Sequence, residues 1–207
     1  MKSYARQLIL DFVSRDLSAV RPRSLVLPDE PRRIITVTGA RRAGKTHLLL
    51  HHIHRLRKTV HPSRLIYINF ENDRLFPFTL EKAQQIIETY YEVYPENKSE
   101  KVYFFFDEIQ NIPEWHLFIR RLYDTENCYL FLTGSSSRLL SREIATSLRG
   151  RTITYELFPL SFPEFAGWSG LTTAPGYTSK QRAELVNACH RYMTSSAFPE
   201  LFGEQEL

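Results

Sequence analysis

Cysteine is scarce in this chain of 207 residues, which contains only Cys128 and Cys189. Two cysteines give neither a disulfide framework nor the spacing of a zinc site, so we expect a reducing, cytoplasmic compartment. Long hydrophobic runs are also missing, because no run approaches the roughly 18 apolar residues that cross a bilayer. Charged residues interrupt the N-terminal segment MKSYARQLILDFVSRD, so we expect no signal peptide and no membrane partner.

Strong charge of one sign is absent too. The formal net charge is +4 at pH 7, with 27 Lys and Arg against 23 Asp and Glu. This charge permits an acidic partner such as DNA but does not establish one, since no helix concentrates Lys and Arg for reading a groove. Hydrophobic residues make up 43% of the chain and charged residues 24%, which is the balance of a globular protein.

Short apolar runs alternate with helical patterns along most of the chain. The runs are rich in β-branched, aromatic and aliphatic residues, as expected for parallel strands covered on both faces. They lie at residues 34–38, 65–70, 102–106, 129–133 and 153–157. Apolar residues recur at helical spacing at 45–57, 80–93 and 114–123. The alternation predicts a three-layer α/β fold, with a mainly parallel five-stranded sheet between two layers of helices.

The two ends of the chain differ from this central part. An amphipathic helix is expected over residues 3–16, and the prolines after it predict an extended connector. Ser161 and Glu164 have the spacing of a capping box, which predicts a short helix after the last strand. The chain therefore divides into an N-terminal helix and connector (1–30), a core (31–168) and a helical extension (169–207).

Residues 39–46 read GARRAGKT, which fits G-x-x-x-x-G-K-[ST] at every position. The motif lies between an expected strand and an expected helix, where successive amide N–H groups and the positive end of the helix can surround a polyphosphate. Lys45 would reach the β- and γ-phosphates, and the Thr46 hydroxyl would bind Mg²⁺. The alternative is a glycine-containing turn that holds a lysine by chance. The expected phosphate-binding residues are Gly39, Ala40, Arg41, Arg42, Ala43, Gly44, Lys45, Thr46 and His47.

Asp107 and Glu108 end the apolar run VYFFF. Carrying two carboxylates to the rim of a sheet is costly unless a cation or a water network compensates them. Ligands of open α/β sheets collect at the carboxyl ends of the strands. We expect Asp107 to hold Mg²⁺ through its water shell and Glu108 to act as general base on the attacking water. Alone, such a pair also fits the start of a solvated loop, but with the phosphate loop it favours hydrolysis of ATP to ADP.

Two further catalytic candidates follow the fourth apolar run. Ser135, in the tip TGSSS, would contact the attacking water or the γ-phosphate, although a turn that caps a helix explains it equally well. Arg151, with Arg149 in reserve, would stabilise the transferring phosphoryl group, in the same chain or in a neighbouring subunit. A surface pair flanking the turn in SLRGRT is the competing interpretation.

These segments together resemble a bacterial and archaeal family of AAA-type (AAA+) ATPases. The resemblance rests on GARRAGKT, YINFEN, FFFDEIQNIPEW, LTGSSSRLLSREIATSLRGR and ELFPLSFPEF, in this order within residues 34–166. It implies the strand order 5-1-4-3-2, a γ-phosphate sensor at Ser135, an arginine finger or sensor at Arg151, and a place for Glu71 near the same rim. Members usually continue into a C-terminal domain of about equal size, which we expect to be missing here after the segment AFPELF.

The sequence leaves three functions open. The first is an ATPase that depends on Mg²⁺, and the second is a nucleotide-gated switch or scaffold with little turnover. The third is an ATP-dependent protein that acts on DNA. A homo-oligomer is implied if Arg151 acts in trans, and a protein partner stays open. Three histidines share helical spacing, but no carboxylate or cysteine completes a metal site, so a solvated face is expected for His47, His51 and His54.

Overall fold

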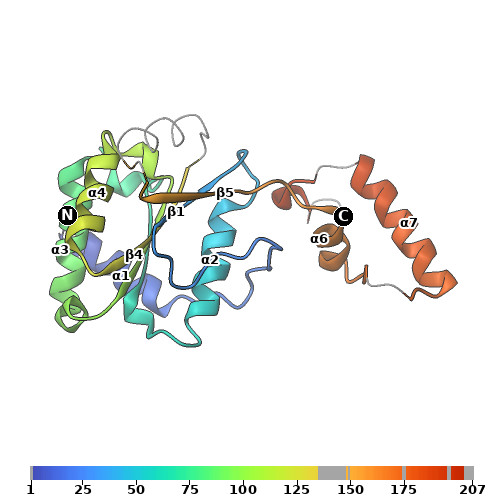
Figure 1. The fold of residues 1–207 in the computed structure, drawn as a ribbon, viewed down its shortest axis with the longest axis horizontal. Coiled ribbons are helices and arrows are strands. Elements are labelled where there is room, and N and C mark those ends of the chain that lie inside the picture. Colours follow the sequence, from blue (N-terminus) through green and yellow to red (C-terminus); the bar gives the residue numbers. More distant parts are fainter. Residues whose placement is uncertain (1, 135–147, 149, 174–175, 195–196, 203–207) are drawn as a thin grey trace.

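Figure 1 shows the computed structural model, in which a lobe built around a sheet carries a smaller helical unit on one side. The structure describes residues 2–134, 148, 150–173, 176–194 and 197–202. The strands are β1 (Ile34–Thr38), β2 (Leu65–Asn69), β3 (Val102–Asp107), β4 (Cys128–Thr133) and β5 (Thr152–Glu156). The α-helices are α1 (Lys2–Ser14), α2 (Lys45–Leu56), α3 (Leu80–Val93), α4 (Trp115–Thr125), α6 (Phe162–Trp168) and α7 (Ser179–Thr194). Short 3-10 helices lie at Pro62–Arg64, Asp73–Leu75, Pro95–Lys98, Ile109–Asn111 and Pro199–Leu201.

The five strands form one parallel sheet in the order β2-β3-β4-β1-β5. Every residue of β1 and β3 is buried, as expected for central strands of a sheet covered on both faces. The predicted fold class is confirmed, and so is the strand order implied by the family resemblance. Observed helices and strands begin and end within about two residues of their predicted bounds.

Alternate residues of the sheet face two separate cores. Phe104 and Phe106 point to a core that also holds apolar residues of α1, α3 and α4. Phe105 points the other way, toward α2, and its ring stacks on that of Phe131 with centroids 4.6 Å apart. Each of these three rings is fully buried, which stabilises the fold by roughly 1.5–3 kcal/mol per side chain. The three aromatic residues therefore hold helices on both faces of β3.

A third, smaller core lies in the helical unit after β5. It consists of Leu160, Phe165, Ala188 and Phe202, with Tyr192 donating a hydrogen bond to the Leu160 carbonyl over 2.8 Å. The Ser161 side chain and Glu164 form the predicted capping box at the start of α6. Within the described residues, no helix is both long enough and apolar enough to cross a membrane.

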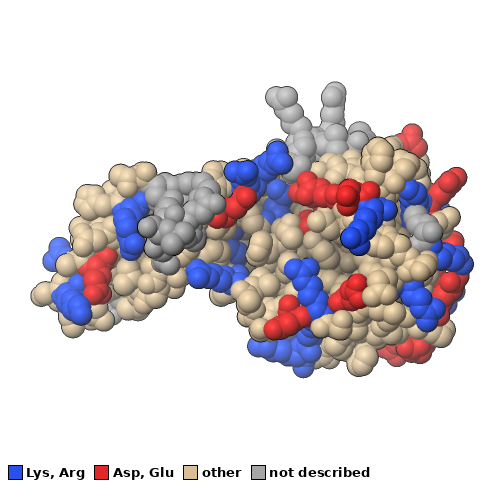
Figure 2. All heavy atoms as spheres, turned by 180° about the vertical axis from the view of Figure 1, so that it is seen from behind, with Lys and Arg blue, Asp and Glu red and all other residues tan. Residues whose placement is uncertain are grey.

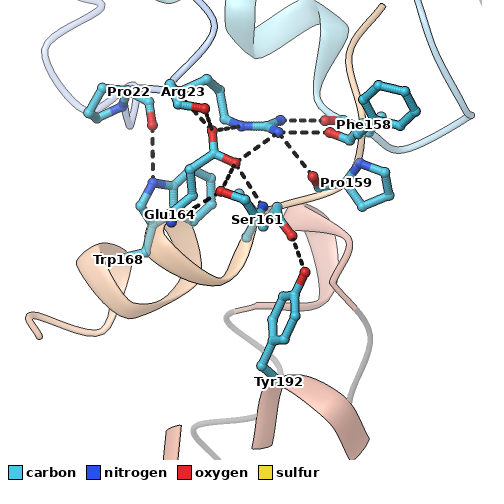
Figure 3. A network of polar contacts seen from close by, with 11 residues as sticks. Pro22, Arg23, Phe158, Pro159, Ser161, Glu164, Trp168 and Tyr192 are labelled. Carbon is cyan, nitrogen blue, oxygen red and sulfur yellow. Dashed lines mark hydrogen bonds and ion pairs between the residues drawn. The ribbon is translucent and has the colours of Figure 1, made fainter. Parts of the chain in front are cut away.

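Arg23 and Glu164 form a buried ion pair between the connector and α6 (Figure 3). The Arg23 Nε lies 2.9 Å from the Glu164 Oε1, and the two side chains are 3% and 9% exposed. The carboxylate also accepts hydrogen bonds from the N–H and hydroxyl groups of Ser24 and Ser161. Burial raises the pKa of Glu164, but the hydrogen bonds from Arg23, Ser24 and Ser161 outweigh burial and lower the pKa to about 2.

This lowered pKa predicts a pH-dependent stability. Because the pKa of Glu164 falls from 4.5 to about 2 on folding, the ionised carboxylate stabilises the fold above pH 4.5, and this contribution is lost as the pH falls toward 2. We expect Glu164→Gln to lower the free energy of unfolding at neutral pH by roughly 2 kcal/mol, with the difference shrinking in acid. Urea unfolding at neutral and acidic pH measures both values.

Glu88→Gln, on the exposed face of α3, is the matched control and should change stability by less than about 0.5 kcal/mol. A cost of Glu164→Gln that is the same at neutral pH and at pH 3 would contradict the role of the ionised carboxylate.

Candidate functional site

The phosphate loop joins the end of β1 to the start of α2, and its backbone requires glycine. Gly39 has a φ of +147°, and a Cβ there would lie 2.2 Å from the Leu157 carbonyl oxygen. Gly44 has a φ of +93° and stands directly before the first residue of α2. Arg42 also has a positive φ, of 68°. A loop with these dihedral angles brings the first turn of α2, with its unpaired amides, to the end of β1.

Lys45 and Thr46 turn their side chains toward the carboxyl edge of the sheet. Lys45 is a buried residue that is 5% exposed. Its ammonium group donates hydrogen bonds to the carbonyl oxygens of Gly39 and Ala40 over 3.2 and 3.1 Å. The Thr46 hydroxyl donates to the Asp107 Oδ2 over 2.7 Å. The loop lysine, the threonine hydroxyl and the strand-end aspartate therefore share one rim.

Asp107 is fully buried and is held by hydroxyl groups of three elements. Besides Thr46, the Tyr67 hydroxyl donates to its Oδ2 over 2.7 Å, and the Thr133 hydroxyl donates to its Oδ1. Burial, followed by the charge of Asp107 and the hydrogen bond to it, raises the pKa of Tyr67, which keeps the phenol protonated as a donor. The carboxylate is thus oriented from β2, β4 and α2 at once.

Glu108 points toward the cleft from an unusual backbone conformation. Its φ and ψ are 53° and 46°, in the left-handed region, and the residue is 8% exposed. The Gln110 side-chain amide donates to the Glu108 Oε2 over 2.5 Å. The backbone N–H of Glu108 donates to the Thr133 hydroxyl over 3.0 Å. Left-handed backbone in a non-glycine residue is uncommon and often marks a functional site.

Glu71 adds a third carboxylate to this rim. Burial raises the pKa of Glu71, and the negative charges of Glu108 and Asp107 raise it further, while Arg41 and Lys45 oppose them. The two neighbouring carboxyl groups therefore disfavour the ionised form of Glu71. The hard oxygen atoms of Thr46 and Asp107 are the donor type that Mg²⁺ takes in proteins.

An open cleft of ≈ 930 Å³ runs from this rim to the helical unit. This volume falls within the range of known sites for small molecules and cofactors. Its far side carries Arg21, whose guanidinium carbon lies 5.3 Å from the ring centroids of both Trp168 and Phe202. The lining residues are Ala19, Arg21, Arg41, Arg42, Gly44, Lys45, Thr46, His47, Glu71, Glu108, Trp168, Pro199, Glu200 and Phe202.

Most of the predicted site residues lie in or beside this cleft. Six of the nine residues in segment 39–47 line it, all except Gly39, Ala40 and Ala43, and Arg42 forms an ion pair of 3.0 Å with Glu200, which also lines the cleft. His47 is exposed and lines the cleft, while His51 and His54 are half-buried. No group of three potential metal ligands (His, Cys, Asp or Glu) is found among the described residues.

Arg151 lies at the other end of the sheet. Its carbonyl accepts the N–H of Ile34, the first residue of β1, and its Nε lies 3.5 Å from the Asp124 Oδ1. The phosphate loop follows the last residue of β1, so Arg151 does not join the cleft of its own chain. Ser135 and Arg149 lie outside the described residues.

Sequence reasoning missed three side chains that shape the site. The sequence predicts Tyr67 only as a strand residue and Thr133 only as the first hydroxyl residue of the tip TGSSS, although both donate hydrogen bonds to Asp107. Arg23 belongs to the connector, yet its guanidinium reaches the Ala43 carbonyl of the phosphate loop over 2.6 Å. A polar residue at the end of an apolar strand was a usable signal for Thr133, whereas nothing local distinguishes Arg23 from its neighbours.

The family model described as an AAA domain matches residues 31–166 of this chain. The chain belongs to this AAA domain family. An uncharacterized protein of Methanocaldococcus jannaschii, MJ1544, is 38% identical over 171 residues, which cover 83% of this chain and 36% of that protein. An uncharacterized protein of Haemophilus influenzae is 34% identical over 133 residues, which cover 64% of this chain and 32% of that protein. The chain therefore spans about a third of the length of these relatives.

Among solved structures, the ADP form of the ORC2 protein of Aeropyrum pernix is similar in fold. The TM-score is 0.50 at 16% identity, and the match covers 89% of this chain and 51% of that one. Membership of the AAA domain family, together with the phosphate loop, supports a nucleotide-binding, ATPase-type domain. The predicted resemblance to AAA-type P-loop ATPases is confirmed.

The Gly39 geometry predicts that Gly39→Ala destabilises the fold and disrupts the phosphate loop. A methyl group 2.2 Å from the Leu157 oxygen requires β1 or the segment after β5 to move, at a cost of roughly 3 kcal/mol in unfolding free energy. Gly170→Ala is the matched control, because Gly170 also has a positive φ, of +75°, but its Cβ would meet nothing within 4 Å. Equal losses in urea unfolding for the two variants would show that the close approach at Gly39 is not limiting.

Proposed function

We propose that this AAA domain binds ATP with Mg²⁺ and hydrolyses it to ADP and phosphate. The observation that carries the proposal is the 2.7 Å hydrogen bond between the Thr46 hydroxyl and the Asp107 carboxylate. It joins the phosphate loop to the acidic end of β3 at one rim of the cleft. The Thr46 hydroxyl and the Asp107 carboxylate would hold Mg²⁺ at this rim, directly or through its water shell, because oxygen atoms are the donors that this ion takes in proteins.

The residues of the loop would bind the triphosphate. Amides at the start of α2 favour anions, and the Lys45 ammonium, now on the Gly39 and Ala40 carbonyls, would move to the β- and γ-phosphates. Thr46 and Asp107 would hold Mg²⁺, which neutralises charge on the phosphate oxygens when bound. Arg41, Arg42 and His47 line the same opening and would contact the outer phosphates or solvent.

Glu108 would act on the attacking water. Its carboxylate would accept a proton as the water oxygen bonds to the γ-phosphorus and the bond to ADP breaks. The hydrogen bond from the Gln110 amide to the Glu108 Oε2 would help to orient this carboxylate. Ser135 as a phosphate sensor and Arg151 as an arginine finger stay part of the proposal, with Arg151 acting on a neighbouring copy in a homo-oligomer.

A nucleotide-gated switch is the second candidate, because one wall of the cleft comes from the helical unit after β5. Action on DNA has less support. On the face shown in Figure 2, Lys and Arg side chains of the coloured residues lie among Asp and Glu instead of forming one basic surface. Nonspecific DNA binding depends on a basic surface whose Lys and Arg side chains neutralise the phosphates of the DNA.

Lys45→Ala tests nucleotide binding. Removing the ammonium should lower the affinity for ATP by about a hundredfold, so that a concentration that stabilises the parent chain by roughly 2.7 kcal/mol gives almost no stabilisation. Thermal unfolding with and without Mg²⁺ and ATP measures this effect. Lys58→Ala, just beyond the C-terminal end of α2 and exposed, is the control and should keep the full shift. An undiminished shift in Lys45→Ala would place nucleotide elsewhere.

Glu108→Gln separates hydrolysis from binding. Loss of the general base should lower the rate of phosphate release by about 10²- to 10⁴-fold, while the affinity for ATP stays close to that of the parent. Glu114→Gln is a matched control, because Glu114 also has a left-handed backbone, with φ of 54°, but does not line the cleft. Negligible turnover in the parent at every protein concentration, with intact ATP binding, would favour the switch.

A further inference from the structure

Arg23 contacts the phosphate loop as well as Glu164. Its Nη1 donates to the Ala43 carbonyl over 2.6 Å in a buried hydrogen bond. A Cβ on Gly44 would lie 3.2 Å from the same nitrogen. Ala43 and Gly44 directly precede α2, whose first turn lines the cleft. The guanidinium therefore packs on the part of the loop backbone that sets the direction of the α2 amides.

The other nitrogen atoms of Arg23 hold the segment after β5 (Figure 3). Its Nη2 donates to the Phe158 carbonyl over 2.8 Å, and its Nε donates to Glu164 over 2.9 Å. Glu164 in turn caps α6 as part of the capping box. One buried side chain thus joins the connector, the phosphate loop and the start of α6.

A second contact from the connector reaches the wall of the cleft. The Trp168 Nε1, at the end of α6, donates to the carbonyl of Pro22 over 3.1 Å (Figure 3). Trp168 lines the cleft together with Phe202, which packs against its ring with centroids 5.5 Å apart. Residues 22 and 23 therefore tie both sides of the cleft to one stretch of backbone.

Only arginine can make these contacts together. Its planar guanidinium presents donors in fixed directions, whereas a lysine ammonium offers one charged point on a flexible stem. Loss of the side chain would leave the Glu164 carboxylate and the Ala43 carbonyl buried without this partner. The relative position of the loop and α6 would then no longer be determined by a single rigid group.

We propose that Arg23 is a positioning residue of the nucleotide site. It holds the phosphate loop at Ala43 and, through Glu164 and the Phe158 carbonyl, sets the distance between the loop and the wall that α6 carries. Nucleotide affinity therefore depends on a residue that touches no nucleotide. This inference rests on the proposed function, because it takes the cleft as the site of a nucleoside triphosphate.

The test compares nucleotide affinity with stability in matched variants. We expect Arg23→Met to weaken the binding of ADP and ATP, measured by calorimetry, by about ten- to a hundredfold. Arg23→Lys should weaken it less, and Glu164→Gln by about threefold, because Arg23 then keeps its bond to Ala43. Adding Glu164→Gln to Arg23→Met should bring no further loss, since the carboxylate acts through Arg23. If Arg23→Met does not fold, Arg23→Lys and Glu164→Gln decide.

Arg57→Met is the control for a structural role. Arg57 also donates to a backbone carbonyl, that of Phe12, over 2.8 Å, but it lies at the other end of α2. The substitution Arg57→Met should lower the free energy of unfolding and leave nucleotide affinity unchanged. If folded Arg23 variants bind ADP and ATP as tightly as the parent does, while Lys45→Ala loses binding, the inference about Arg23 is overturned and the proposed function stands. A parent chain that binds neither nucleotide would overturn the proposed function as well.

Discussion

The buried carboxylate of Asp107 is the constraint on which the arrangement of the rim depends. A fully buried carboxylate is costly unless donors surround it, and here hydroxyl groups from α2, β2 and β4 supply them. Tyr67 and Thr133 can reach Asp107 only because β2 and β4 flank β3 in the sheet. Thr46 can reach it only because the phosphate loop returns the chain to the same edge. Strand order and loop conformation therefore serve a single buried charge.

Positive φ angles recur around the same carboxylate. Gly39, Arg42 and Gly44 in the loop and Glu108 at the end of β3 all have positive φ values. Residues other than glycine, such as Arg42 and Glu108, adopt this conformation at a cost of roughly 1 kcal/mol or more. At Glu108 the conformation separates two neighbouring acids, so that Asp107 stays in the core while Glu108 lines the cleft. This separation supports the proposed function, in which Asp107 acts toward a cation and Glu108 toward water.

Local patterns in the sequence predicted most of the fold. Apolar runs of β-branched and aromatic residues identified all five strands, because central parallel strands are apolar on both faces. The motif GARRAGKT and the two acids after VYFFF predicted that the candidate site lies at the carboxyl edge of the sheet, because ligands collect at the carboxyl ends of such strands. The pairing of Arg23 with Glu164, 141 residues away, left no local pattern. No local pattern distinguishes His52 from the neighbouring histidines either. His52 is buried against Phe131, and burial lowers its pKa to about 4.

The position of Arg151 restricts how copies of this chain can cooperate. Arg151 lies beside the first residue of β1 and the phosphate loop follows the last, which separates them by on the order of 15 Å along the strand. An arginine at that end can serve a phosphoryl group only on another chain whose carboxyl edge faces it. Where such a contact joins two different surfaces, it closes into a ring or continues as a filament. An arginine finger at Arg151 therefore requires either a head-to-tail assembly of this kind or a two-fold dimer whose shared surface contains both Arg151 and the opening of the cleft, so that each chain supplies the arginine of the other.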